Sequence, residues 1–401
     1  MLITVRPDRL VAGGEAMARD DDGRVVFVTG ALPGELVEVE IDSTKKDYAR
    51  GAVVDVLEPS PLRDSPSCAH RRAGCGGCDW MHLQPAAQLD AKAEIVRESL
   101  RRVARLEEVT VDNLVRTGSS VSQFGYRTTI RVVGGPDGMV GFREHKTSEV
   151  VPVTSCPVAE SKLSRLLPLL NVDEGAELTL RSSVATGAIT AIWDRKYRKS
   201  IRGLPREVHI GERGWLTERV AGHDLRVSAG SFFQSGAQAA ELLVAAVAEA
   251  APELAGARHA VDAYGGVGLF AVTTMQTAAR VTLIESARSA WFDAEHNMGE
   301  REHVIIRGEV ARWKARDNDP VDVIVADPAR PGLAKPGVAA LTAASPSVLV
   351  LVNCDPVSLA RDTTLLAAAG YVPERVEVFD LFPNTHHVET VTRFVPAGLT
   401  A

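Results

Sequence analysis

The sequence predicts an α/β protein in which a mostly parallel sheet, with helices on both faces, follows a small β-barrel and a second β-rich unit. Three observations lead to this prediction. From about residue 235, β-rich runs alternate with helical stretches, which is typical of a parallel sheet. Residues 1–58 hold short β-rich runs separated by Gly, Pro and Asp turns, a pattern that favours a barrel. The proline-rich stretch 59–66 cannot continue a sheet interior and indicates a linker.

Composition limits the class of protein. With 401 residues, of which 45% are hydrophobic, the chain can bury the cores of roughly two or three domains and is not intrinsically disordered. No stretch approaches the ~20 apolar residues of a membrane span, and the opening residues lack the apolar core of a signal peptide, so we expect a cytoplasmic protein. The formal net charge of -7 gives no hint of a polyanionic partner, so any nucleic-acid surface must be a local patch.

The N-terminal elements follow from β-rich runs and from one amphipathic segment. Strands are expected within a barrel of residues 1–60, at 25–28, 36–41 and 51–56. Residues 61–84 are expected to form a linker that contains three cysteines. From Pro85 to Leu106 the apolar residues recur at helical spacing, which predicts an amphipathic helix. We expect this unit, residues 85–108, to dock its apolar face on another domain.

The rest of the chain divides into two further units. Residues 109–228 are expected to form a central β-rich domain, with strands at 128–133, 178–181 and 188–193. Residues 229–401 are expected to form the α/β domain, which opens with a helix over 237–251. About seven strands are predicted there, at 260–262, 281–284, 304–306, 321–325, 348–352, 376–379 and 390–394.

A glycine-rich loop follows the first of these strands. The strand 260–262 continues into Tyr-Gly-Gly-Val-Gly-Leu over 264–269 and then a helix, so backbone can approach a ligand at a helix N-terminus. Glu285 ends the next strand, where its carboxylate is placed to accept hydrogen bonds from both hydroxyls of a ribose. Nicotinamide enzymes share this arrangement, and glycines packed between strand and helix beside a solvated Glu285 are the alternative without a cofactor.

Three further segments of the α/β domain carry recognisable motifs. The strand 321–325 leads into Ala-Asp-Pro-Ala-Arg-Pro-Gly over 326–332, and the strand 348–352 leads into Asn-Cys-Asp-Pro over 353–356. Both lie at carboxyl ends of strands, where open α/β sheets bind ligands. The third segment, 380–390, reads Asp-Leu-Phe-Pro-Asn-Thr-His-His-Val-Glu-Thr.

Together with the glycine loop, the Ser-Phe-Phe-Gln of 231–234 and four cysteines, these segments resemble the RNA uracil-5 methyltransferase family, above all its 23S ribosomal RNA branch. The resemblance implies that S-adenosylmethionine is the methyl donor. It also implies a class I (Rossmann-like) seven-stranded methyltransferase domain, an N-terminal OB-like TRAM β-barrel and a central β-rich domain.

The chemistry of such enzymes explains the residue types. Carbon 5 of uracil is too weak a nucleophile to take a methyl group directly, so a thiolate must first add to carbon 6. The resemblance assigns the thiolate to Cys354, and it assigns to Glu389 the base that later removes the carbon 5 proton. A buried structural cysteine and an ordinary strand-end carboxylate are the alternatives at these positions. Arg330 or Arg361 would support the thiolate, and spacing does not decide which.

The resemblance also places side chains around the S-adenosylmethionine and uracil pockets, namely Gln234, Tyr264, Glu285 and Asp327, and Gly266 is expected to contact the cofactor. His386 and His387 are expected to have structural or substrate-positioning roles. Asp355 stands where many relatives carry Asn. Because a carboxylate beside a thiolate disfavours the charged thiolate, we expect Asp355 to raise the pKa of Cys354 and to reduce activity or shift its pH optimum.

The cysteines are too few for a disulfide scaffold, since the chain has five. The set Cys68, Cys75, Cys78 and Cys156 contains one Cys-x-x-Cys pair and two outlying thiols. Structural zinc sites usually show two such pairs, so uneven all-thiolate ligation fits a 4Fe-4S cluster better, and the resemblance implies the same cluster. Zinc and free thiols are the alternatives. We expect the cluster to pin the linker to the central domain, because the reaction transfers no electrons.

An RNA partner is expected to meet local basic patches. Residues 195–202 hold five cations and a Tyr, Arg206 extends them, and Arg71 and Arg72 lie in the cysteine loop; a solvated charged hairpin is the alternative for 195–206. Uracil must leave its stack to reach Cys354, so the target is expected in a loop or opened helix. Large-subunit ribosomal RNA is the expected substrate of a monomeric enzyme. The alternatives are transfer RNA, a non-catalytic RNA-binding protein, and methylation of adenine or protein amines.

Overall fold

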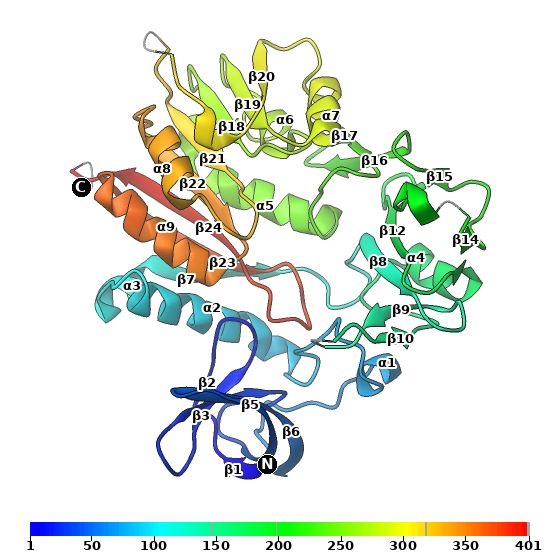
Figure 1. Cartoon of the computed structure of the whole chain (residues 1–401). Helices are drawn as coiled ribbons and strands as arrows, with labels where there is room; N and C mark the ends of the chain where they lie inside the picture. The colour runs from blue at the N-terminus through cyan, green and yellow to red at the C-terminus, as the bar shows by residue number, and fades with distance from the viewer. Residues whose placement is uncertain (146, 198, 317–318, 399–401) are drawn as a thin grey trace.

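The computed structural model describes residues 1–145, 147–197, 199–316 and 319–398. Figure 1 shows a barrel at the N-terminus, a central β-rich region, and an α/β region that contains the C-terminal part of the chain. Helix α2 (Pro85–Arg102) lies between the barrel and the α/β region. In the part of the chain that the structure describes, no helix combines the length and the apolar character that crossing a membrane requires.

The barrel is a curled sheet with one face on an apolar core. Among the residues described, its strands number six, in the order β1-β5-β6-β4-β3-β2. Val26, Val28, Val37 and Val39 point inward and are fully buried, which gives the alternation of a sheet with one packed face. The three strands predicted for this region are confirmed as β4, β5 and β6. The strands are β1 (Leu2–Val5), β2 (Arg9–Leu10), β3 (Ala16–Arg19), β4 (Val25–Thr29), β5 (Leu36–Thr44) and β6 (Tyr48–Glu58).

The linker contains the short helix α1 (Ala69–Arg72) and leads into α2, which confirms the helix predicted there. The helix begins with Pro85, whose fixed backbone angle and missing N–H suit the first helical position. The apolar residues of α2 pack in two different hydrophobic cores. Ile95 joins the core of the barrel, whereas Ala93 and Val96 join the core on one face of the α/β sheet. Helix α2 therefore connects the barrel to the α/β region.

The central region is a sheet of short antiparallel strands with one parallel edge pair. Within the described residues the strand order is β10-β9-β8-β12-β13-β15. The strands predicted at 128–133, 178–181 and 188–193 are confirmed as β8, β12 and β13. The elements are β8 (Thr129–Gly134), β9 (Val140–Arg143), β10 (Val150–Pro152), α4 (Ser161–Leu166), η1 (Leu167–Leu169), β11 (Asn171–Val172), β12 (Glu177–Ser182), β13 (Ile189–Ile192), η2 (Arg195–Tyr197), β14 (Ile201–Arg202) and β15 (His209–Ile210).

The α/β region is built on one twisted sheet in which the strands predicted from the sequence are all present. Its order is β20-β19-β18-β21-β22-β24-β23-β7, and β24 runs antiparallel to β22 and β23. Every residue of β18, β21 and β22 is buried and most of them are apolar, as expected for strands covered on both faces. The strands are β18 (Ala260–Ala263), β19 (Val281–Glu285), β20 (His303–Arg307), β21 (Val323–Ala326), β22 (Val348–Asn353), β23 (Tyr371–Asp380) and β24 (Glu389–Pro396).

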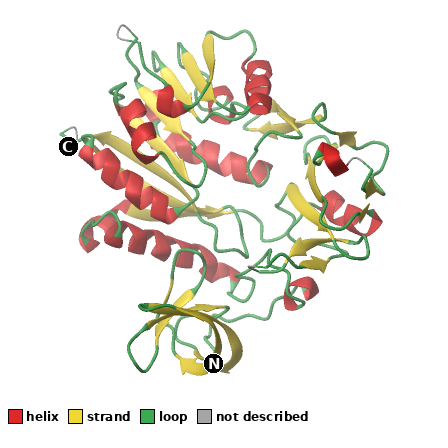
Figure 2. Ribbon diagram, viewed as in Figure 1, coloured by secondary structure: helices red, strands yellow, loops and turns green. Residues whose placement is uncertain are grey.

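Helices cover both faces of this sheet, as Figure 2 shows. One apolar core contains residues of α2, α3, α8 and α9, and the other contains residues of α5, α6 and α7. The helices are α3 (Glu108–Leu114), α5 (Ala237–Ala250), η3 (Pro252–Leu254), α6 (Leu269–Val272), α7 (Arg288–Met298), η4 (Val310–Arg312), α8 (Ala334–Thr342) and α9 (Pro356–Ala368).

Three segments lie elsewhere than predicted. Helix α3 overlaps the expected central domain, but its Val111 and Leu114 join the core that contains residues of α8 and α9. Strand β7 (Val115–Ser120) falls within the expected central domain, yet it pairs in parallel with β23 and makes the sheet eight-stranded among the described residues, where seven strands were predicted. Most of its residues are exposed, so no apolar alternation marked it. The hairpin of β16 (Trp215–Val220) and β17 (His223–Ser228) was also expected in the central domain, but its buried Leu216 and Leu225 belong to the α5 core.

Candidate active site

The proposed nucleophile and base meet across two neighbouring strands. Cys354 is the first residue after β22, and Glu389 is the first residue of β24. Asn353 pairs with Thr390 in the antiparallel register of these strands, so the next position places Cys354 opposite Glu389. Side chains of directly opposed residues point to the same face, with their Cβ atoms about 5 Å apart. Asp327 follows β21, which neighbours β22 on its other side, so three chemically active side chains gather at one edge.

The free site disfavours negative charge. Burial raises the pKa of Cys354 to about 12, and the Glu389 and Asp327 carboxyls add to this effect. Burial likewise holds the pKa of Glu389 well above its usual range, with Asp327 adding to the shift. Asp327 is partly exposed, yet the surrounding protein raises its pKa to about 7. The Cys354 thiol is therefore protonated at neutral pH, and the Glu389 carboxyl holds its proton more tightly than an ordinary carboxyl does.

The two candidate arginines, Arg330 and Arg361, have different partners in the structure. The positive charge of Arg330 lowers the pKa of Cys354, and the Arg330 guanidinium lies 3.3 Å from Nε2 of His387. Arg361 instead donates to the Pro331 carbonyl and to the Asp362 carboxylate at 2.7 Å. Asp362 also accepts from the Leu333 backbone N–H, so Arg361 belongs to the support of the loop that carries Arg330.

Asp355 has a role that sequence spacing did not reveal. Its carboxylate accepts a hydrogen bond from the Ser358 backbone N–H at 2.7 Å and so caps the N-terminus of α9, which Pro356 begins. The expected direction of its effect on Cys354 holds, because its charge does raise the pKa of the thiol. Burial, Glu389 and Asp327 raise this pKa more strongly than Asp355 does, and Arg330 opposes them.

The glycine loop is held in a conformation suited to a close ligand. Tyr264 has a φ of 62° and Gly266 a φ of 56°, and only the glycine adopts such a backbone without strain. Glu285 reaches across from β19 and accepts from the Gly266 N–H at 2.9 Å and from the Ala287 N–H at 2.5 Å. These contacts bring Glu285 and Gly266 together, as the resemblance implied.

A cavity of about 490 Å³ opens beside Glu285, at the ends of β19 and β20. Its lining includes the aromatic ring of Trp313 together with Ile306 and the backbone of Gly308. Sequence reasoning missed Trp313. An aromatic residue soon after the strand that follows Glu285 was the sequence feature that could have indicated it. That feature alone is too weak to predict a binding residue.

Buried hydrogen bonds hold the segment that carries Gln234. Its side-chain amide donates to Asp327 at 3.0 Å, so it does reach the strand ends. The preceding Ser231 donates its hydroxyl to Asp293 at 2.6 Å, and the Ser231 carbonyl accepts from Arg181 at 2.6 Å. Arg181 comes from β12 and Asp293 from α7, so central and α/β regions jointly fix this segment. Sequence reasoning missed both residues, because neither lies in a motif.

The four candidate ligand cysteines surround one cavity of about 390 Å³, which Cys68, Cys75, Cys78 and Cys156 all line. None of the four is in a disulfide. Burial raises the pKa of Cys78 to about 12, with Cys156, Cys75 and Cys68 contributing. Within the described residues, no three His, Cys, Asp or Glu side chains are grouped closely enough for one metal ion. The arrangement thus gathers four thiols without forming a single-ion site.

The basic patch of residues 195–206 is largely neutralised by neighbouring acids. Arg195 pairs with Glu212 at 3.1 Å, and Lys196 lies 3.7 Å from Asp194. Arg202 is 2.7 Å from Asp173. Arg198, which the sequence analysis counted in this patch, lies outside the described residues. This pattern favours the solvated-hairpin alternative for the described part of the patch.

Known proteins match the chain over nearly its full length. Residues 2–54 match the TRAM domain family model. An uncharacterized RNA methyltransferase of Streptomyces avermitilis is 34% identical, over 96% of this chain and 96% of its own length. One from Corynebacterium glutamicum is 31% identical, over 98% of this chain and 97% of its own.

Among solved structures, the Pyrococcus abyssi tRNA (uracil-54, C5)-methyltransferase in complex with S-adenosyl-L-homocysteine shares the fold. Its TM-score is 0.73 at 24% identity, and the match covers 98% of this chain and 100% of that one. Fold and relatives together define the class as a methyltransferase with an N-terminal TRAM domain. The chain belongs to the RNA methyltransferase family.

Proposed function

We propose that this protein transfers a methyl group from S-adenosylmethionine to carbon 5 of a uridine in RNA. The observation that carries the proposal is the register of β22 and β24, in which Asn353 and Thr390, the neighbours of Cys354 and Glu389, are paired at the carboxyl edge of the sheet. A nucleophile and a base that face each other across one nucleobase are what C5 alkylation of a pyrimidine requires. Methylation of adenine or of protein amines needs no such thiol.

The reaction follows from these side chains. The Cys354 thiol first loses its proton to solvent, which the positive charge of Arg330 favours, and the thiolate then adds to carbon 6 of uracil. This addition places the electron pair on carbon 5 and the adjacent carbonyl. Bound S-adenosylmethionine supplies an electrophilic methyl group. Carbon 5 bonds to that methyl, Glu389 then takes the carbon 5 proton, and the carbon 6–sulfur bond breaks to return the thiolate. Glu389 must be ionised to take this proton, and once ionised its raised pKa makes it a stronger base than an ordinary carboxylate.

The methyl donor is proposed to lie along the glycine loop. Glu285 would hold the ribose hydroxyls, and Trp313 in the cavity beside it would pack against the adenine. Gly266, Tyr264, Gln234 and Asp327 would surround the remainder of the donor and the uracil. The Pyrococcus abyssi enzyme, which shares the fold, is in complex with S-adenosyl-L-homocysteine, which supports S-adenosylmethionine as the donor but not the choice of individual residues.

Cys68, Cys75, Cys78 and Cys156 are proposed to hold a 4Fe-4S cluster. The support for this proposal is that all four thiols line one cavity, since four thiolates are the ligand set of such a cluster. Iron and sulfide analysis of anaerobically purified protein tests this proposal, with iron and sulfide near four per chain expected from the cluster formula. Stoichiometric zinc in a colourless protein would overturn it.

The substrate is proposed to be large-subunit ribosomal RNA, acted on by a monomer in the cytoplasm. Transfer RNA is the competing substrate, since the Pyrococcus abyssi enzyme is a tRNA methyltransferase. Mapping 5-methyluridine in both RNA classes, from cells with and without the gene, decides between them. A uridine methylated only when the protein is present identifies the target; unchanged 5-methyluridine in every RNA would refute the proposed function and favour a non-catalytic RNA-binding protein.

A further inference from the structure

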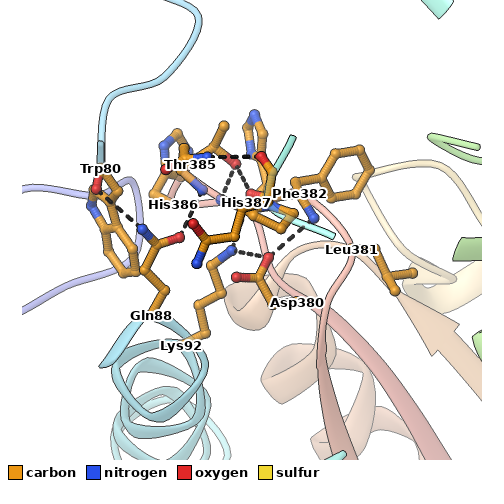
Figure 3. Close-up of polar contacts among 12 residues, drawn as sticks. Trp80, Gln88, Lys92, Asp380, Leu381, Phe382, Thr385, His386 and His387 are labelled. Atoms are coloured by element: carbon orange, nitrogen blue, oxygen red, sulfur yellow. Dashed lines mark hydrogen bonds and ion pairs between the residues drawn. The ribbon is translucent and has the colours of Figure 1, made fainter. Parts of the chain in front are cut away.

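The loop that leads to Glu389 is anchored by elements outside its own sheet. This catalytic loop, residues 380–389, joins β23 to β24. Figure 3 shows Lys92 and Gln88 of α2 reaching into it. Lys92 Nζ, on a fully buried side chain, donates to Asp380 at 2.5 Å and to the Phe382 carbonyl at 3.2 Å. Gln88 accepts from the Asn384 backbone N–H at 2.7 Å.

The linker contributes a second anchor beside a candidate cluster ligand. Asp79 directly follows Cys78, and its carboxylate accepts from Nδ1 of His386 at 2.5 Å and from the His386 backbone N–H at 3.3 Å. Trp80, the next residue, donates its backbone N–H to the Asn384 carbonyl at 3.0 Å. The Asp79–His386 pair therefore fixes both the backbone and the ring of a loop residue.

The barrel closes over this pair. A Cβ atom added to Gly14 would lie 2.6 Å from Cβ of His386 and 2.9 Å from a carboxylate oxygen of Asp79. The Gly14 carbonyl also accepts from the Trp80 indole N–H at 3.0 Å. Barrel, cysteine linker and catalytic loop thus meet at one point, with no room for a side chain on the barrel.

From His386 the contacts lead to the nucleophile. The His386 and His387 rings lie 4.3 Å apart between centroids, and His387 is in turn 3.3 Å from the Arg330 guanidinium. Arg330 is the cation whose charge favours the thiolate of Cys354. A shift of His386 would displace His387 and with it the support for Arg330. Misplacement of such a group by about 1 Å can slow a reaction by roughly a hundredfold.

We propose that Asp79 is a positioning residue: its pair with His386, closed over by Gly14, holds His387 and, through His387, the guanidinium of Arg330, which is the cation that acts on Cys354. The inference rests on the proposed function, because it concerns the formation of the Cys354–uracil bond. It goes beyond that function by making one linker carboxylate, adjacent to Cys78, necessary for the geometry of the active site.

The test compares Asp79→Ala, His386→Ala and the double variant, with Asp64→Ala as a matched control on an exposed linker carboxylate. The full-length protein with its cluster is mixed with S-adenosylmethionine and RNA that carries 5-fluorouridine, since the fluorine cannot leave as a proton and the adduct accumulates. Three quantities are measured for each variant: the rate of covalent adduct formation, the dissociation constant of S-adenosylmethionine, and the iron content.

Each single variant is expected to slow adduct formation roughly tenfold, and the double variant no more than the slower single one, because both remove the same contact. Affinity for S-adenosylmethionine and iron content should stay within about twofold of the parent, which a general loss of structure would not allow. Gly14→Ala, which pushes on the pair without removing it, should slow the adduct as well.

An Asp79→Ala rate within about twofold of the parent, losses that multiply in the double variant, or a parallel loss of S-adenosylmethionine affinity would each overturn the inference. Absence of any adduct with the parent protein is a different result: it refutes the proposed function, and the inference falls with it.

Discussion

The two halves of the candidate active site are built in different ways. The cofactor half, around the glycine loop, is local: Gly266 lies in the loop after β18, Glu285 ends the neighbouring β19, and Glu285 accepts from the backbone N–H groups of Gly266 and Ala287. The nucleophile half depends on side chains from distant parts of the chain, and Lys92 and Asp380 are 288 positions apart. Substitutions should therefore separate binding of the methyl donor from formation of the covalent adduct.

The largest effect is expected from the base in the nucleophile half. Glu389→Gln should slow turnover about a thousandfold or more, since proton abstraction by a positioned base is worth roughly 10²–10⁴ in rate. The adduct between Cys354 and unmodified uridine RNA should then accumulate, because its formation does not need this proton transfer. Gel-shift of denatured protein detects the adduct. Glu374→Gln, an exposed carboxyl on the neighbouring β23, is the control and should form no excess adduct.

The second-largest effect is expected from the buried ion pair between Lys92 and Asp380 in the nucleophile half. Lys92→Met removes the partner of Asp380 and leaves a carboxylate whose pKa burial already raises. Breaking a buried ion pair costs about 3–5 kcal/mol, so the free energy of unfolding in urea should fall by about that amount. Lys92→Met combined with Asp380→Asn should recover part of the loss, because no charge is then buried alone. A loss below about 1 kcal/mol would show that the pair does not anchor the loop.

A smaller effect is expected in the cofactor half. Glu285→Gln keeps the shape of the side chain but weakens its hydrogen bonds, so the dissociation constant of S-adenosylmethionine should rise roughly tenfold. The rate of adduct formation at saturating donor should stay within about threefold of the parent. Isothermal titration measures the first quantity, and Glu295→Gln, an exposed carboxyl on α7, is the control. Equal losses in both quantities would contradict the separation of the two halves.

The smallest effect concerns Asp327, which lies where the two halves meet. Its folded pKa of about 7 is raised above the ordinary carboxyl value, so the folded state binds its proton more tightly than the unfolded chain. This contribution to stability is complete below the ordinary carboxyl pKa and is lost as the pH rises through about 7. Asn does not titrate, so in Asp327→Asn the free energy of unfolding should fall with rising pH by about 1–2 kcal/mol less than in the parent. This figure is reduced to allow for the partial exposure of Asp327. Urea unfolding at pH 5 and pH 8 measures it; an unchanged pH dependence would contradict the raised pKa.

The sequence predicted the local parts of this molecule and missed those that depend on distant contacts. Strands such as β22 carry continuous apolar runs and end in a motif, so the sequence alone was enough to place Cys354 at a strand end. Strand β7 shows no such run, because most of its side chains face solvent and its pairing with β23 sets its position. The contact of Asp79 with His386 spans 307 positions and leaves no trace in local spacing.

The same difference between local and distant contacts explains which roles of the site residues could be predicted from the sequence. Choosing Arg330 over Arg361 required knowing that Arg361 is held by Asp362 and Pro331. Asp355 was the acidic neighbour of the thiol that the sequence revealed, because it is adjacent to Cys354 along the chain. In the folded chain the Asp355 carboxylate caps the N-terminus of α9. Glu389 raises the pKa of Cys354 more strongly than Asp355 does.

The most direct test of the covalent mechanism is to identify the residue that bonds to RNA. The full-length protein is incubated with S-adenosylmethionine and 5-fluorouridine RNA, digested with protease and nuclease, and analysed by tandem mass spectrometry. The account predicts a methylated 5-fluorouridine attached to the peptide that contains Cys354, and no adduct from Cys354→Ala. An adduct on another residue, or methyl transfer by the Cys354→Ala variant, would contradict it.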